Sequence, residues 1–141
     1  MTNTGSSIQL RRLLWVGPLT VVAAILGVLL VRIIAVAVLR PDPMPMSLSW
    51  ALPSIFTAVL VTAAVVVFAL VARFAKTPIR TYQVIAFVAL LLSLVPDAAY
   101  PGSGMPGASW QTAIVLMLMH VVAWAICVTM LTRLSMGASK A

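Results

Sequence analysis

The chain has 141 residues, of which 63% are hydrophobic and 8% are charged. Because a soluble domain carries roughly 25% charged residues, this composition excludes an ordinary water-soluble protein and predicts an integral membrane protein. The formal charge of +7 does not indicate a nucleic-acid partner, since the basic residues lie mostly beside hydrophobic runs, where they orient the chain and contact anionic lipid. The lipid bilayer is the expected partner.

The first hydrophobic run covers residues 13–39 and follows a polar segment, residues 1–12, that we expect to be a flexible cytoplasmic tail. Its uninterrupted part, from Leu13 to Val31, is already longer than the roughly 7–15 apolar residues of a secretory signal. The run therefore predicts an uncleaved transmembrane helix. Pro18 removes one backbone hydrogen bond and is expected to bend the first turns of this helix.

Three further runs, residues 51–72, 78–97 and 110–133, each have the roughly 20 residues that one crossing needs. Proline-rich, basic and glycine-rich segments separate them, in that order. The sequence therefore predicts an all-α membrane protein, an antiparallel bundle of four transmembrane helices within residues 13–133. A short cytoplasmic tail, residues 134–141, follows the bundle.

Short polar residues and prolines mark the predicted helix ends. Ser47 or Ser49 can cap the second helix, and Ser109 can cap the fourth. Thr77 followed by Pro78 is typical of a capping residue and a first helical position. At the end of the third helix, Pro96 and Asp97 indicate a stop or a nearby kink.

Basic residues gather on one side of the predicted bundle. With four crossings, the side that holds both termini carries Arg11, Arg12, Arg73, Lys76, Arg80, Arg133 and Lys140. Because positive loops stay in the cytoplasm, both termini are expected there, in a multi-pass protein of a bacterial plasma membrane.

Small and polar residues recur at helical spacing on three of the predicted helices. In lipid, small residues let helix backbones approach closely and polar side chains add hydrogen bonds of about 1 kcal/mol. We interpret these stripes as packing seams: Gly17, Thr20, Ala24 and Arg32, with Ala23 and Gly27 beside them; Thr81, Ala89, Ser93 and Asp97; and Ala113, His120, Ala123 and Cys127.

His120 is the sharpest single feature, because it lies about 15 Å along the helix from Trp110 and therefore deep in the membrane. A charged imidazole there would cost several kcal/mol, so a neutral ring is expected. Ser93 and Thr62 reach a similar depth, and a hydrogen bond to one of them would make His120 a structural residue. A proton-carrying or ligand-binding histidine is the alternative, and an axial haem ligand is a narrower form of it.

Arg32 and Asp97 form a second candidate pair, because both approach the outer interface on helices that could be neighbours. An ion pair there would offset the desolvation of both groups. Without it, Arg32 would extend to the outer headgroups, and Asp97 would be a solvated loop residue.

Polar chemistry is otherwise sparse. Cys127 is the single cysteine, which excludes dithiol redox chemistry within one chain, and we expect no metal and no cofactor. The leading interpretation is a non-enzymatic accessory or interaction protein that forms a homo-oligomer or joins another membrane protein. One alternative is a small-solute or proton-linked transporter with His120, Arg32 and Asp97 along its path. The other is a redox carrier or enzyme that depends on His120.

Two short motifs connect the chain to a known group of proteins. They are Pro96-Asp97 and the segment Leu118-Met119-His120-Val121-Val122-Ala123. With them the chain resembles an uncharacterised bacterial family of small four-helix membrane proteins, common in actinobacteria. This resemblance implies four spans and no particular activity.

Overall fold

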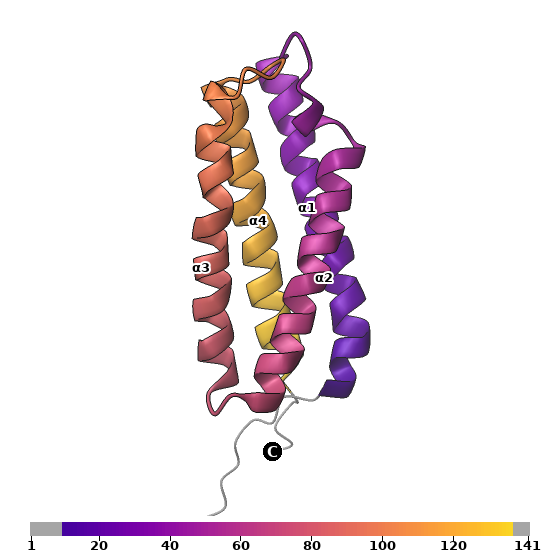
Figure 1. Ribbon diagram of the computed structural model, residues 1–141. Coiled ribbons are helices and arrows are strands. Elements are labelled where there is room, and N and C mark those ends of the chain that lie inside the picture. Colours follow the sequence, from indigo (N-terminus) through magenta and orange to yellow (C-terminus); the bar gives the residue numbers. More distant parts are fainter. Residues whose placement is uncertain (1–9, 137–141) are drawn as a thin grey trace, which may run out of the picture.

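The computed structural model describes residues 10–136, so residues 1–9 and 137–141 of the predicted tails lie outside the described part. Four long helices, α1 (Leu13–Leu39), α2 (Ala51–Phe74), α3 (Pro78–Ala99) and α4 (Trp110–Leu134), run up and down beside one another (Figure 1). All four are long and apolar enough to cross a membrane. The predicted fold class is confirmed.

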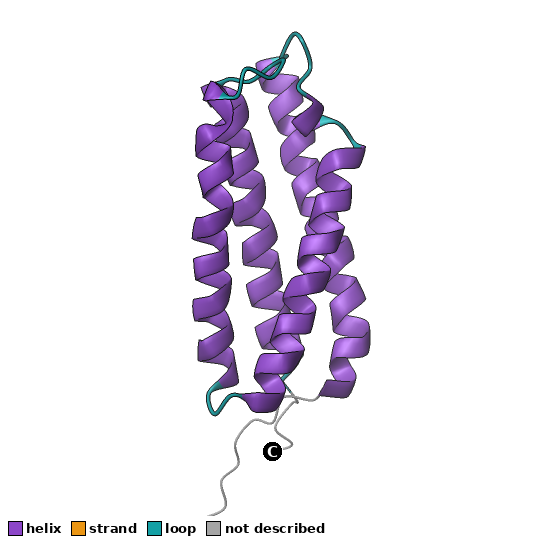
Figure 2. Ribbon diagram, in the orientation of Figure 1, coloured by secondary structure: helices purple, strands orange, loops and turns teal. Residues whose placement is uncertain are grey.

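Three short 3-10 turns accompany the helices: η1 (Leu10–Arg12), η2 (Met46–Leu48) and η3 (Tyr100–Gly102). Figure 2 shows the loops at the two ends of the bundle. The loop end carries residues 40–50 and 100–109, and the terminal end carries the start of α1, the end of α4 and the turn at residues 75–77. Residues 10–12, predicted as part of a flexible tail, form a turn that leads directly into α1.

The helices occupy four corners in chain order. Helix α1 packs against α2 and α4, and α3 packs against the same two helices. The pair α2 and α4 makes the closer diagonal contact, so α1 and α3 lie at opposite corners. This arrangement decides which polar groups can meet.

Serine caps form at two of the predicted positions. Ser49 Oγ accepts the Leu52 N–H at 3.2 Å, and Ser109 Oγ accepts the Thr112 N–H at 3.2 Å. Pro78 is the first residue of α3, as predicted, but the Thr77 side chain makes no capping bond. That part of the prediction is wrong: Thr77 has φ −126° and ψ 72°.

Helix α3 does not stop at Pro96 but continues to Ala99. Proline lacks an N–H and leaves one carbonyl without its helical partner, yet interrupting a helix in lipid would leave several backbone groups unpaired. Because the helix continues, Asp97 is a helical residue and is buried, at 7% exposure. The expectation of a solvated loop aspartate is therefore wrong.

The exterior of the bundle is apolar over its whole length. The exposed fractions of Leu14, Leu26, Val59 and Leu92 are 62–79%, and many other Leu, Val, Ile and Phe side chains are exposed as well. In water such a continuous surface would drive aggregation. In a bilayer it faces acyl chains, as four membrane-spanning helices require.

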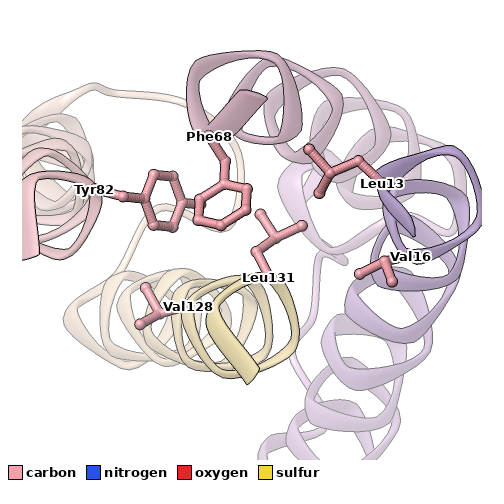
Figure 3. Close-up of a cluster of buried hydrophobic side chains, with 6 residues drawn as sticks. All are labelled: Leu13, Val16, Phe68, Tyr82, Val128 and Leu131. Atoms are coloured by element: carbon pink, nitrogen blue, oxygen red, sulfur yellow. The ribbon is translucent and has the colours of Figure 1, made fainter. Parts of the chain in front are cut away.

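The interior at the terminal end is closely packed. Figure 3 shows side chains from all four helices converging there: Leu13, Val16, Phe68, Tyr82, Val128 and Leu131. The Phe68 and Tyr82 rings meet edge to face, with centroids 4.8 Å apart, a favoured aromatic geometry. Tyr82 anchors α3 to the rest of the bundle at this end.

Helix α1 is held along its length by the predicted stripe of small and polar residues. Gly17, Thr20, Ala24 and Arg32 are all buried, so this seam is confirmed. A Cβ at Gly27 would lie 2.7 Å from Ile126 Cδ1, which shows how closely α1 approaches α4. The stripe predicted on α3 forms only in part, because Asp97 is buried and Ala89 is exposed.

At the loop end, the two connections contact each other. Ser47 Oγ and the Tyr100 hydroxyl are 3.1 Å apart. Gly107 has φ +73°, and a Cβ there would lie 2.6 Å from Pro45 Cγ. Gly107 is therefore required both by its backbone conformation and by the close approach of the first loop.

Candidate functional site

The Asp97 carboxyl group and the His120 imidazole meet between α3 and α4. Asp97 Oδ2 lies 2.8 Å from His120 Nδ1. The carboxylate is buried, with 9% of its side chain exposed, whereas the imidazole is 32% exposed. The two residues were singled out separately in the sequence, but each was assigned to a different partner.

The position of the ring proton follows from the partners of Nδ1. This nitrogen also lies 3.0 Å from the Leu116 carbonyl oxygen, one turn earlier on α4. A carbonyl oxygen can only accept, so the contact with Leu116 is a hydrogen bond in the tautomer that carries its proton on Nδ1. Asp97 Oδ2 makes a short contact with the same nitrogen but has no hydrogen-bond partner of its own. The second ring nitrogen, Nε2, has no hydrogen-bond partner within residues 10–136.

Arg32 does not pair with Asp97, and the predicted pair is wrong. The Arg32 Nε–H donates to the Leu48 carbonyl at 2.7 Å, and the guanidinium carbon lies 3.7 Å from the centroid of the Trp50 ring. The reason is the arrangement of the helices, since α1 and α3 occupy opposite corners. A cation–π contact and a carbonyl acceptor replace the expected carboxylate.

Ser93 and Thr62 do not contact His120 either. Ser93 Oγ donates to the Leu90 carbonyl and Thr62 Oγ1 to the Ala58 carbonyl, each at 2.7 Å. Both hydroxyls are thus satisfied by their own helix, a common alternative for hydroxyls in helices. Thr62 is exposed on the outside of α2. The expectation that one of them would be the histidine partner is wrong.

A cavity of about 500 Å³ lies between α2 and α3, with α4 as its floor. Its volume falls in the range of small-molecule sites, roughly 300–1,000 Å³. Phe56, Leu60 and Ile85 line it and are 59%, 53% and 41% exposed, so the cavity opens sideways between α2 and α3. Met119, at 5% exposure, marks its floor.

His120 lines this cavity together with mostly apolar neighbours. Ser93 also lines it, whereas Arg32, Asp97 and Thr62 do not. Asp97 therefore contacts the imidazole from outside the cavity. Aromatic rings on three helices complete the wall: Phe56, Tyr82 and Trp124.

Sequence reasoning missed the cavity and the Asp97–His120 contact. The contact had a usable signal, because consecutive antiparallel helices joined by a short loop are neighbours, and Asp97 and His120 lie on such a pair. Distances along the helices argued against the contact, because Asp97 is close to the end of α3 while His120 is about 15 Å from the start of α4. Within residues 10–136, no group of three or more His, Cys, Asp or Glu side chains is gathered that could hold a metal ion.

Comparison with protein families matches residues 5–136 to the Family of unknown function (DUF6069). No curated protein and no solved structure matches the chain. The predicted relationship to an uncharacterised family is confirmed, and the chain has the four helices that the resemblance implied. A bacterial or actinobacterial origin stays a prediction.

Proposed function

Because the chain belongs to the Family of unknown function (DUF6069), and membership assigns no activity, we propose a function from the cavity. The protein is a non-enzymatic accessory protein of the membrane that works by holding a membrane-soluble molecule between α2, α3 and α4. The observation that carries the proposal is a cavity of about 500 Å³ that opens sideways among exposed apolar side chains. A ligand dissolved in the bilayer can enter it without crossing water.

The shape of the cavity suits an elongated molecule. Leu52 and Val67 both line the cavity, which gives it a length of about 22 Å along α2. An apolar chain of that length can lie along the cavity between α2 and α3.

Transport is the weaker candidate, because its proposed path required Arg32 and Asp97. Arg32 contacts the Leu48 carbonyl and the Trp50 ring. Asp97 contacts the His120 imidazole. Neither lines the cavity. A bound molecule would reach His120 but would not find these two charges.

The proposal is tested by photolabelling purified protein in phosphatidylcholine nanodiscs with a dodecane that carries a diazirine, followed by mapping of the adducts by mass spectrometry. We expect adducts on Met119 and Ala123 of the floor that excess dodecane removes. Ala89→Phe, which adds a ring inside the cavity, should abolish them. Val88→Phe, the neighbouring position outside the cavity, is the matched control and should leave them unchanged. Adducts confined to outward-facing side chains would overturn the proposal.

We also propose that the protein lies in the plasma membrane and that the terminal end of the bundle faces the cytoplasm. The exposed basic residues Arg73, Lys76 and Arg80 at that end support this sidedness. In a Cys127→Ala background, a membrane-impermeant maleimide should label Met46→Cys on intact cells and label Lys76→Cys only after lysis. The reverse pattern would place the termini outside.

A further inference from the structure

Thr57 brings an unpaired hydroxyl to the wall of the cavity. It lies on the buried face of α2, is 9% exposed and lines the cavity. Hydroxyls inside helices commonly donate to the carbonyl one turn back, and this bond is made here by Thr20, Thr62, Thr129 and Thr132. Within residues 10–136, the Thr57 hydroxyl has no hydrogen-bond partner. Because an unpaired buried hydroxyl is costly, a ligand that supplies the missing partner is favoured.

The polar groups of the cavity lie on its loop-end side. Thr57 is about 9 Å from the start of α2, and Ser93 is about 9 Å from the end of α3. His120 follows at about 15 Å from the start of α4. On the terminal side, Tyr82 and Trp124 contribute ring surface, because the Tyr82 hydroxyl oxygen and the Trp124 indole nitrogen are fully buried atoms. The cavity therefore matches an amphiphile whose polar head points to the loop end.

The apolar side of the cavity is closed by the packed cluster at the terminal end. Tyr82 belongs both to the cavity wall and to this cluster, where it meets Phe68 (Figure 3). From Thr57 to Val67, the last lining residue of α2, the distance along the helix is about 15 Å. An extended aliphatic chain advances about 1.3 Å per carbon, given a C–C bond of about 1.5 Å. About 12 carbons therefore span the space between the Thr57 hydroxyl and the closed end.

The lining also restricts the charge of the head group. Among the described residues that line the cavity there is no Lys, Arg, Asp or Glu, so a carboxylate or phosphate would enter lipid without a counter-charge, which is expensive. An alcohol hydroxyl is uncharged and can both donate and accept a hydrogen bond. It can pair with the Thr57 hydroxyl, and it is compatible with a neighbouring His120 in either protonation form.

From these observations we propose that the cavity binds a single-chain aliphatic alcohol. Its hydroxyl forms a hydrogen bond with Thr57 Oγ1, and its chain of about 12 carbons extends past Trp124 toward the terminal end. The inference rests on the proposed function, because it names the ligand class of the same cavity.

The test compares 1-dodecanol with n-tridecane, which has the same number of heavy atoms but no hydroxyl. Each competes with the diazirine-bearing dodecane for labelling of Met119 and Ala123 in phosphatidylcholine nanodiscs, at concentrations corrected for measured partitioning into the bilayer. One hydrogen bond to a buried hydroxyl should make the alcohol about 3- to 10-fold more effective. Thr57→Val, which removes the hydroxyl, should reduce this preference to less than twofold, whereas Thr57→Ser should keep it.

Thr62→Val is the matched control, because Thr62 lies on the same helix but is exposed and does not line the cavity. It should leave the preference intact. Equal competition by both molecules in the unaltered protein, or a preference that survives Thr57→Val, would overturn the inference. If both compete equally and Ala89→Phe abolishes the labelling, the proposed function stands without it. If no adduct in the cavity can be displaced, both proposals fail.

The direction of the chain has a separate measurement. Two forms of 1-dodecanol, with the diazirine at carbon 3 or at carbon 11, are crosslinked to the unaltered protein and the adducts are mapped by mass spectrometry. Carbon 3 should label residues near Thr57 and Ser93, and carbon 11 should label residues near Val67 and Cys127. The opposite pattern, or the same adducts from both forms, would refute the proposed orientation.

Discussion

Helices α1 and α3 have similar surroundings but are held in the bundle by different means. Helix α1 buries eight residues spread over its length, from Leu13 to Ala35. Helix α3 buries two, Tyr82 near its start and Asp97 near its end. A continuous seam of small residues therefore fixes α1, whereas α3 is attached at two points with a cavity between them.

The difference has a functional meaning. A helix that packs along its full length leaves no room for a ligand, and dispersion contacts accumulate at each turn. A helix held at two points can leave a lined space in the middle while its ends stay in place. In this protein one attachment is the contact of the Phe68 and Tyr82 rings and the other is the Asp97–His120 contact, which also faces the cavity through His120.

The largest expected effect comes from removing the aromatic attachment. Tyr82→Ala leaves a void beside Phe68 and should lower the free energy of unfolding by about 3 kcal/mol. Unfolding in detergent–SDS mixtures measures it. Tyr82→Phe is the matched control: the Tyr82 hydroxyl is buried without a partner, so its loss should leave stability unchanged or raise it by about 1 kcal/mol. Equal losses in both variants would contradict the described packing.

A larger side chain at Gly27 tests how closely α1 packs against α4. Gly27→Leu drives a side chain into Ile126 and Val122 and should cost about 2 kcal/mol in the same unfolding measurement. Gly27→Ala places one methyl group 2.7 Å from the flexible tip of Ile126 and 3.1 Å from Val122 Cγ1, and it should cost less, since a rotamer change of Ile126 relieves the closer contact. A Leu variant as stable as the Ala variant would show that α1 and α4 do not approach closely there.

The Asp97–His120 contact should show energetic coupling of about 1 kcal/mol. A double-mutant cycle with Asp97→Asn and His120→Leu measures it. Each single change leaves the other side chain without its polar partner, so the double variant should be more stable than the sum of the two losses predicts. Strict additivity would mean that the two side chains do not interact.

The smallest expected effect concerns the loop end of α1. Arg32→Lys keeps the charge but loses the planar guanidinium above Trp50 and should cost about 0.5–1 kcal/mol of stability. Trp50→Leu should cost a similar amount, and the two losses should not add. Additive losses would show that the stacking contributes nothing.

Much of the fold could be predicted from residue order, because lipid requires each backbone polar group to be satisfied within its own segment. A run such as residues 110–133 must then be a helix, and its neighbours follow by the same argument. The even number of runs places the first and last helix ends of the chain at the same end of the bundle. The small residues on α1 also identified its packing face correctly, since close approach in lipid depends on them.

Only the tertiary structure decided which polar groups meet. Depth along a helix made Arg32, Ser93 and Thr62 plausible partners for Asp97 or His120, but depth carries no information about the direction a side chain faces or the corner its helix occupies. Placing α1 opposite α3 separates Arg32 from Asp97, and continuing α3 past Pro96 turns Asp97 toward His120. The cavity likewise arises from the spacing of α2 and α3, which no single helix encodes.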